Sequence, residues 1–310
     1  MQKPFYIMRD RAFVAALIIL TTLSGCAADK PPPMPVLTGT GVTLLAGGDI
    51  ADCRYLPAAG AGAASTAELV AAELARDPAA VVLTLGDNTY PVGALGEFTS
   101  CYEPTWGRFK ARTFPSPGNH DYATKGAPGY YDYFGAAAGP QRRGYYSFSV
   151  GKWLVISLNS NLRPPEMETQ ITWLKAELER NKAPCTLAYW HHPVFSSGGH
   201  GDDLRMAEAW KVLMAANAEL VLAGHDHDYE RFAPLDAAGN RDDAHGLRQF
   251  VVGTGGTNLS PFRLRRDHSQ ASDNSTHGIL KLVLKDAGYE WEFLPVLQGG
   301  FTDKGATRCH

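Results

Sequence analysis

Short apolar runs alternate with longer amphipathic segments along most of the chain. The runs over 42–46 and 80–85 have the length and composition of buried strands. Between them, Ser65-Thr66-Ala67-Glu68 matches a capping box and predicts a helix that ends before Asp77-Pro78. These segments together predict a β-α-β unit.

The second half continues this alternation. Strands are expected over 153–158, 186–190 and 219–222, with helices over about 168–181 and 204–216 between them. Near the end, strands over 278–284 and 289–294 flank Asp286-Ala287-Gly288 as a hairpin. We therefore expect an α/β fold that includes some antiparallel strands.

Polar residues gather where the predicted strands end. The clusters are Asp49, Asp87-Asn88-Thr89-Tyr90, Asn119-His120, His191-His192 and His225-Asp226-His227. Because sites in open α/β sheets form beyond the carboxyl ends of the strands, all five clusters can converge on one cleft. Oxygen and nitrogen donors without cysteine suit iron, zinc or manganese. The donors are too numerous for one ion, so we expect two ions that share a bridging carboxylate.

In their order along the chain, these clusters resemble the motifs of calcineurin-like metallophosphoesterases, and within that family those of purple acid phosphatases. The matching blocks are Gly48-Asp49, Gly86-Asp87-Asn88-Thr89-Tyr90, Gly118-Asn119-His120-Asp121, His191 and Gly224-His225-Asp226-His227. Tyr229-Glu230-Arg231 and 253–256 are weaker matches. The resemblance implies a metallophosphoesterase-type four-layer α/β/β/α sandwich with mixed sheets, as a single catalytic domain over 42–298 with a C-terminal tail over 299–310.

The resemblance also implies a role for each residue at two metal sites. Ferric iron would be held by Asp49, Asp87, Tyr90 and His227, and a second ion (zinc, ferrous iron or manganese) by bridging Asp87 with Asn119, His191 and His225. A phenolate favours a trivalent ion, whereas an amide and imidazoles suit a divalent one. His192 is the alternative ligand to His191, and the spacing to Pro193 favours His191.

One departure from the family pattern distinguishes its branches. Ala51 stands where purple acid phosphatases commonly have glycine, so the loop shape is expected to differ. In the cyclic-nucleotide phosphodiesterase and nuclease branches, the Ala51 position is a histidine ligand and the Tyr90 position is not tyrosine. Ala51 together with Tyr90 therefore favours the tyrosinate branch.

The expected reaction is the hydrolysis of small phosphate monoesters. Two cations about 3.5 to 4 Å apart would generate metal-bound hydroxide, which attacks phosphorus in line. A histidine would protonate the leaving group. His120 is the first candidate, and His200 is the second because the family carries a substrate-contacting histidine there. His192 is the third. An exposed loop position for His200 and a packing role for His192 remain open.

Two other functions fit the same residues. One is a phosphodiesterase or nucleotidase that uses the same pair of metals. The other is a non-catalytic extracytoplasmic binding lipoprotein, against which the complete ligand set argues. Two further motifs are interpreted as structural: the run 130–134 is expected to pack, and 253–256 to form a tight turn near the site.

The amino terminus has the pattern of a bacterial lipoprotein signal. Positive residues precede an apolar run over 12–20 that is too short to span a bilayer comfortably, and Leu23-Ser24-Gly25-Cys26 follows. We expect residues 1–25 to be removed and a lipid on Cys26 to be the only membrane contact, with 26–41 as a proline-rich tether. Ala27 favours the outer membrane or cell surface. An ordinary secretory signal is the alternative.

Composition and cysteines add further expectations. With 310 residues, 45% of them hydrophobic, the chain can bury a core, and its net charge of -3 gives no reason to expect a nucleic-acid partner. No obligate protein partner is indicated. Besides Cys26, the cysteines are Cys53, Cys101, Cys185 and Cys309. We favour disulfides Cys53–Cys101, between loops after the first two strands, and Cys185–Cys309, with buried free thiols as the alternative.

Overall fold

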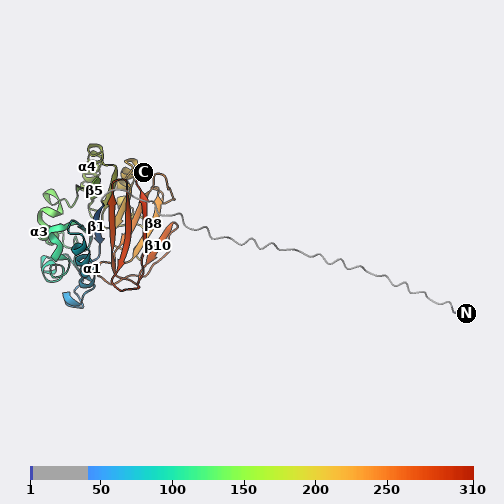
Figure 1. Cartoon of the computed structure of the whole chain (residues 1–310), viewed down its shortest axis with the longest axis horizontal. Helices are drawn as coiled ribbons and strands as arrows, with labels where there is room; N and C mark the ends of the chain where they lie inside the picture. The colour runs from blue at the N-terminus through green and yellow to red at the C-terminus, as the bar shows by residue number, and fades with distance from the viewer. Residues whose placement is uncertain (3–40) are drawn as a thin grey trace. The chain divides into compact units, whose positions relative to one another are not determined.

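Two mixed β-sheets lie at the centre of the catalytic domain in the computed structural model, which describes residues 1–2 and 41–310 (Figure 1). The predicted signal, the lipid site at Cys26 and the tether fall almost entirely on residues 3–40 and so lie outside the described residues. Within the described part of the chain, no helix is both long and apolar enough to cross a bilayer.

The first sheet has six strands in the order β13-β12-β11-β1-β2-β3. They are β1 (Val42–Gly47), β2 (Val81–Leu85), β3 (Thr113–Ser116), β11 (Gly278–Lys285), β12 (Gly288–Pro295) and β13 (Lys304–Arg308). β1, β2 and β3 are parallel, and α1 (Gly62–Arg76) connects β1 to β2. This is the predicted β-α-β unit, and the predicted hairpin is β11 with β12.

The second sheet has seven strands in the order β10-β8-β9-β7-β6-β5-β4. They are β4 (Tyr146–Val150), β5 (Trp153–Ser157), β6 (Cys185–Tyr189), β7 (Leu220–Ala223), β8 (Tyr229–Leu235), β9 (Leu247–Val252) and β10 (Ser269–Asp273). The crossovers α4 (Glu166–Arg180) and α5 (Ala207–Ala215) lie close to the predicted helices. Because β5, β6, β7 and β9 are parallel, their carboxyl ends meet at one edge.

Three separate apolar cores show that the domain has four layers. The central core lies between the sheets and includes Leu83 of β2 and Leu187 of β6. A second core packs α1 and α3 (Pro128–Phe134) against the six-stranded sheet, and Figure 1 shows these helices on one side of the strands. A third core packs α4 and α5 against the seven-stranded sheet. The α/β/β/α sandwich with mixed sheets is confirmed, and four of the aromatic residues over 130–134 are buried in the second core.

The start of α1 differs from the prediction. The helix begins at Gly62, and Ala61 precedes it without a side-chain cap, so Ser65 lies on an exposed position inside the helix. Thr66 is buried, donates a hydrogen bond to the Gly255 carbonyl (2.6 Å) and accepts one from Trp106 Nε1 (3.0 Å). The predicted capping box is therefore wrong, because the helix begins three residues before Ser65 and leaves that residue no role as a cap.

The end of the chain also differs from the expected separate tail. Within 299–310, strand β13 pairs antiparallel with β12, and Cys309 forms a disulfide with Cys185 at the start of β6. Residues 304–308 carry no apolar alternation that would indicate a strand. Pairing with the open edge of β12 decides their conformation, so the domain extends to the carboxyl end.

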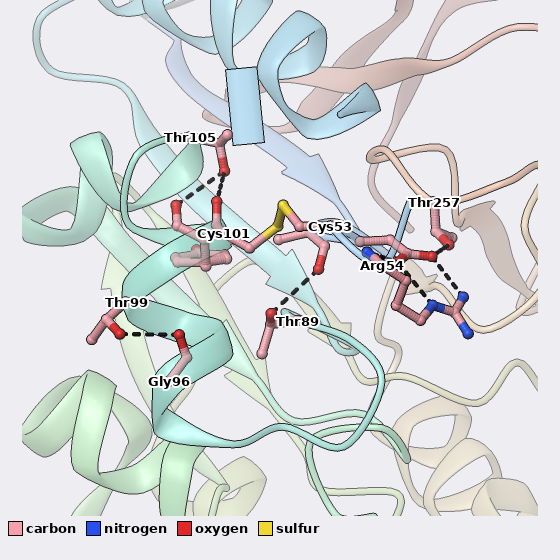
Figure 2. Close-up of a disulfide and its surroundings, with 11 residues drawn as sticks. Cys53, Arg54, Thr89, Gly96, Thr99, Cys101, Thr105 and Thr257 are labelled. Atoms are coloured by element: carbon pink, nitrogen blue, oxygen red, sulfur yellow. Dashed lines mark hydrogen bonds and ion pairs between the residues drawn. A yellow bond between two sulfur atoms is a disulfide. The ribbon is translucent and has the colours of Figure 1, made fainter. Parts of the chain in front are cut away.

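Both favoured disulfides are present, with Cα atoms 5.9 Å apart in each. Cys53–Cys101 joins the loop after β1 to the short helical segment η2 (Phe98–Tyr102), as Figure 2 shows. Cys185–Cys309 joins the two sheets. The alternative of buried free thiols is therefore wrong for all four cysteines.

Candidate metal centre

The carboxyl ends of strands from both sheets carry the predicted metal-binding residues. Asp49 follows β1, Asp87 follows β2, Asn119 follows β3, His191 follows β6, and His225 follows β7. Asp49, Asp87 and His191 are at most 1% exposed, and donor atoms of all three lie within 4.8 Å of one another. Parallel strand direction in each sheet and the packing of the sheets on each other produce this convergence.

The backbone turns sharply at three of these residues. Asp49, Asp87 and His225 have positive φ values of 59°, 46° and 72°, a left-handed conformation that is costly for residues other than glycine. Each comes directly after a glycine and a strand end. The strained backbone positions therefore coincide with predicted metal-binding residues.

The glycines before these residues leave room for the side chains of neighbouring strands. A Cβ atom at Gly86 would lie 2.5 Å from His191 Nδ1, and one at Gly224 would lie 2.6 Å from Asp49 Oδ2. A larger residue at either position would displace a donor. Gly86 and Gly224 are therefore required by close approach within the site.

Three donors gather around the Tyr90 hydroxyl, which is the fourth of the group. Tyr90 Oη lies 3.0 Å from Asp49 Oδ1, 3.3 Å from Asp87 Oδ2 and 3.4 Å from His227 Nε2. His227 Nε2 is in turn 3.5 Å from Asp49 Oδ1, while its Nδ1 bonds to the Asn258 carbonyl at 2.9 Å. This group is the set expected at the ferric site.

The second set of donors gathers around His191 Nε2. This atom lies 3.0 Å from Asn119 Oδ1, 3.3 Å from Asp87 Oδ2 and 3.3 Å from His225 Nδ1. Its other nitrogen, Nδ1, bonds to the Leu85 carbonyl at 2.8 Å, which fixes the ring orientation. All seven predicted metal-binding residues thus lie in two adjoining groups, with Asp87 Oδ2 equally close to both.

Burial and neighbouring charges shift the pKa values of several residues in the two groups. Burial, and then the charges of Asp49 and Asp87, raise the pKa of Tyr90 well above its usual value. Burial disfavours the charged form of Asp87, yet the neighbouring His191 and the backbone N–H of His120 hold the pKa of Asp87 well below its usual range. Burial also opposes protonation of His191, but Asp87 raises the pKa of His191 to about 9. Three acidic groups at hydrogen-bond distance in a buried site form a donor set that fits a multivalent cation.

His120 lies at the edge of this cluster. Its backbone N–H donates to Asp87 Oδ1 at 2.7 Å, and its Nδ1 lies 2.7 Å from the Pro91 carbonyl. Nε2 is 3.9 Å from Asp87 Oδ2, and the side chain is 34% exposed. The ring centroid is 4.4 Å from that of Tyr90. His120 therefore faces both the donors and solvent.

His200 also reaches the cluster, through a loop after β6. Its ring stacks on that of His225 with centroids 4.2 Å apart, and its side chain is 52% exposed. Asp226 accepts hydrogen bonds from His200 N at 2.8 Å and lies 3.0 Å from His200 Nδ1. Asp226 raises the pKa of His200, with burial opposing it. His200 is exposed but held in place against a predicted ligand.

His192 lies beneath the cluster. It is 1% exposed, its Nδ1 lies 2.7 Å from Ser160 Oγ, and its ring centroid is 4.4 Å from that of His225. One of its ring nitrogens lies within 4.8 Å of donor atoms of His191 and His225. His191, rather than His192, lies against both Asp87 and Asn119, in agreement with the spacing to Pro193.

Two acidic residues within the motif blocks have roles that the sequence analysis left unassigned. Asp121 Oδ2 accepts from Gly118 N (2.8 Å) and from Asn88 Nδ2 (2.9 Å), so it joins the loops after β2 and β3. Asp226 holds His200. Each of these residues is next to a histidine in the sequence, and this position indicated a place at the site. The sequence alone does not show whether such a carboxylate binds metal or holds a neighbouring residue in position.

The loop over 253–256 lies at the site, as expected of a tight turn there. Gly255 N donates to the Gly48 carbonyl at 2.9 Å, and Thr257 N donates to the Asp49 carbonyl at 2.9 Å. Ala51 is fully buried, donates a backbone hydrogen bond to the Asn88 carbonyl and accepts one from Tyr90 N. The loop after β1 is thereby fixed on two sides.

Comparison with known proteins agrees with this geometry. The calcineurin-like phosphoesterase family matches residues 43–229, more than half of the chain. Purple acid phosphatase 21 of Arabidopsis thaliana is 30% identical over 160 residues, which cover 47% of this chain and 36% of that protein. Purple acid phosphatase 18 of the same plant is 31% identical over 131 residues, 40% of this chain and 30% of that protein. The chain thus spans about a third of the length of these relatives.

Solved structures show the same fold at low sequence identity. A purple acid phosphatase from yellow lupin seeds superposes with a TM-score of 0.68 at 18% identity, over 89% of this chain and 55% of that one. A dimetal phosphatase from Danio rerio gives a TM-score of 0.60 at 13% identity, over 87% and 99% of the two chains. The chain therefore belongs to the calcineurin-like phosphoesterase family and has purple acid phosphatases among its sequence relatives and structural neighbours.

Proposed function

We propose that this chain hydrolyses phosphate monoesters at a two-metal site built from the seven clustered donors. One observation carries the proposal: Asp87 Oδ2 lies 3.3 Å from Tyr90 Oη and 3.3 Å from His191 Nε2, so one carboxylate oxygen serves both donor groups. This is the arrangement that a shared, bridging carboxylate requires. A phosphodiesterase or nucleotidase would use the same residues, and the test below separates them.

The donor chemistry assigns different ions to the two groups. Asp49, Asp87, Tyr90 and His227 would hold ferric iron, since two carboxylates and a phenolate favour a trivalent ion. The residues for zinc, ferrous iron or manganese would be Asp87, Asn119, His191 and His225. Two such ions, when bound, would polarise the phosphoryl oxygens and activate water.

His120 is proposed to deliver the proton to the leaving group. The Pro91 carbonyl lies 2.7 Å from His120 Nδ1 and can only accept a hydrogen bond, so Nδ1 carries a hydrogen and donates it in both states of the ring. Nε2, on the side of Asp87, then gains and loses the second proton. Partial exposure lets the ring exchange protons with solvent, as a general acid must between turnovers.

His200 is proposed to bind the phosphoryl group. Asp226 lies against Nδ1 and the backbone N–H, so Nε2 is the nitrogen left to face a ligand. The stacked His225 ring fixes the plane of His200. His192, buried behind His225, is proposed to hold that ring in place without touching substrate.

The test is metal analysis of the purified protein together with hydrolysis of phenyl phosphate and of bis(phenyl) phosphate by the same sample. We expect about two metal ions per chain and a faster monoester reaction. Asp87→Ala and His225→Ala should lose metal and activity together. A matched control is Asp286→Ala, which removes an exposed carboxylate in the turn between β11 and β12, far along the sheet from the site.

Different results would change the proposal in defined ways. Preference for the diester would assign the site to a phosphodiesterase. Full activity in metal-stripped protein, or metal retained by Asp87→Ala, would contradict the two-metal site. A metal-loaded protein that hydrolyses neither ester would favour the binding-protein alternative.

We also propose that the protein is extracytoplasmic and attached to a bacterial membrane, at the outer membrane or cell surface, by a lipid on Cys26. The support is the sequence Leu23-Ser24-Gly25-Cys26 and the presence of two disulfides, which persist in oxidising compartments. Release of a soluble form would follow if the chain carries an ordinary secretory signal instead.

A further inference from the structure

One arginine lies at the candidate metal centre without a role in the proposed chemistry. Arg54 follows Cys53 in the loop after β1, and its guanidinium carbon is 5.7 Å from the centre of the Tyr90 ring. Its side chain is 39% exposed. The ring of His120 also lies beside Tyr90, with centroids 4.4 Å apart, so Arg54 and His120 share this tyrosine as a neighbour.

The position of Arg54 is fixed by several contacts. Asp52 Oδ1 accepts from Arg54 N (3.1 Å) and Nε (2.9 Å), and Asp52 Oδ2 accepts from the Nη2 atom (2.6 Å). Thr257 Oγ1, 3.2 Å from Asp52 Oδ2, holds that carboxylate, and Figure 2 shows this group beside the Cys53–Cys101 disulfide. A side chain held this way loses little freedom when it binds a ligand.

One edge of the guanidinium remains open. Asp52 occupies Nε and one hydrogen of Nη2, out of five N–H donors on the side chain. Among residues 41–310, Nη1 has no hydrogen-bond acceptor. The open edge, formed by Nη1 and Nη2, has the spacing that binds both oxygens of a carboxylate or phosphate.

We propose that Arg54 determines specificity by binding a second anionic group, a carboxylate or a further phosphate, on the leaving-group side of the substrate. The inference rests on the proposed phosphomonoesterase function and adds a substrate class to it. An exposed ion pair made only for stability would not need the bracing by Thr257 and the disulfide beside a metal-site tyrosine. The preferred substrates are therefore phosphate esters of acidic molecules.

The test compares phenyl phosphate with 3- and 4-carboxyphenyl phosphate, which differ by one anionic group. The protein should show a higher kcat/KM for at least one carboxylated ester. Arg54→Gln should lower the ratio of kcat/KM for the carboxylated ester to kcat/KM for phenyl phosphate by roughly tenfold or more. That factor is the size expected for a hydrogen bond between charged groups. Arg54→Lys keeps the charge without the paired donors and should give an intermediate ratio.

The control is Arg241→Gln. Arg241 also pairs with an aspartate two residues away, Asp243, but is exposed in the loop between β8 and β9. This variant should keep the ratio of the parent protein. A parent protein without preference for either carboxylated ester, or Arg54→Gln that lowers all three rates equally, would overturn the proposal.

Binding of non-hydrolysable analogues separates this inference from the proposed function. Phenylphosphonate and 3-carboxyphenylphosphonate, titrated by calorimetry, should show the same preference and the same loss in Arg54→Gln. If no ester is hydrolysed, the proposed function fails, and the ratio of these two affinities alone decides the role of Arg54. Equal affinities in the parent protein would overturn it.

Discussion

At the scale of single residues, Tyr90 contacts more of the proposed functional groups than one role would require. Its hydroxyl contacts two carboxylates and His227, its ring packs beside His120, and Arg54 lies over the same ring. Because these contacts surround one side chain, changes there test the metal assignment directly.

Tyr90→Phe tests the ferric assignment. A tyrosinate bound to ferric iron absorbs visible light, so iron-loaded protein should be coloured and the variant should lose that band. Metal should still bind, more weakly at the first site, since Asp49, Asp87 and His227 remain. Absorption spectra and metal content of both proteins measure this. A colourless parent protein that is fully active with two zinc or manganese ions would contradict ferric iron and leave a general dimetal phosphoesterase.

His120→Ala tests the proposed proton donor. Turnover should fall by roughly 10² to 10⁴, the usual share of acid–base catalysis, while metal content stays unchanged. The turnover of a substrate whose leaving group needs no proton, such as 4-nitrophenyl phosphate, should fall much less than the turnover of phenyl phosphate. Loss of metal in this variant, or an equal loss for both substrates, would show that His120 has a different role.

At the scale of elements, the amino end of α1 shows how a tertiary contact replaces a local signal. Thr66→Val should lower the free energy of unfolding by about 1 to 3 kcal/mol, because Trp106 Nε1 and the Gly255 carbonyl lose their buried partner. Urea unfolding measures the change. Ser65→Ala is the control, expected within about 0.5 kcal/mol of the parent protein. If Ser65→Ala instead lowered the free energy of unfolding by about 1 kcal/mol, Ser65 would act as the helix cap that the sequence predicts.

At the scale of the whole molecule, the disulfides join parts that are distant in sequence. The two bonds close segments with sequence separations of 48 and 124 residues. Replacing either pair by serines should lower the free energy of unfolding by about 2 to 5 kcal/mol, since the unfolded chain regains conformational freedom. Urea unfolding without reductant gives the value, and reduced parent protein provides the comparison. An unchanged unfolding midpoint in both variants would contradict this.

The membrane attachment is also a property of the whole molecule. Cys26→Ser should block lipid attachment and leave precursor or a differently processed form, while the domain from Val42 onward should still fold and bind metal. Fractionation and mass spectrometry of the processed chain check this. Unchanged processing and membrane partitioning in the variant would refute the lipoprotein interpretation.

The sequence by itself determined the fold class, the main strands and the identity of the clustered donors. These features are local: apolar runs mark buried strands such as β2, and donor residues such as Asp87 and His225 follow directly where the strands end. The order of the blocks was enough to indicate the family. The pairing of Cys53 with Cys101 was favoured correctly because loop positions follow from the strand pattern, and Cys185 with Cys309 then followed by elimination.

The tertiary structure decided what depends on partners far away along the chain. Strand β13 exists because β12 offers it an open edge, and Thr66 in the first turns of α1 bonds to Gly255, 189 residues away. The position of Arg54 over Tyr90 likewise depends on which surfaces face each other. Such contacts are set by the packing of the two sheets, and no local pattern of residues encodes them.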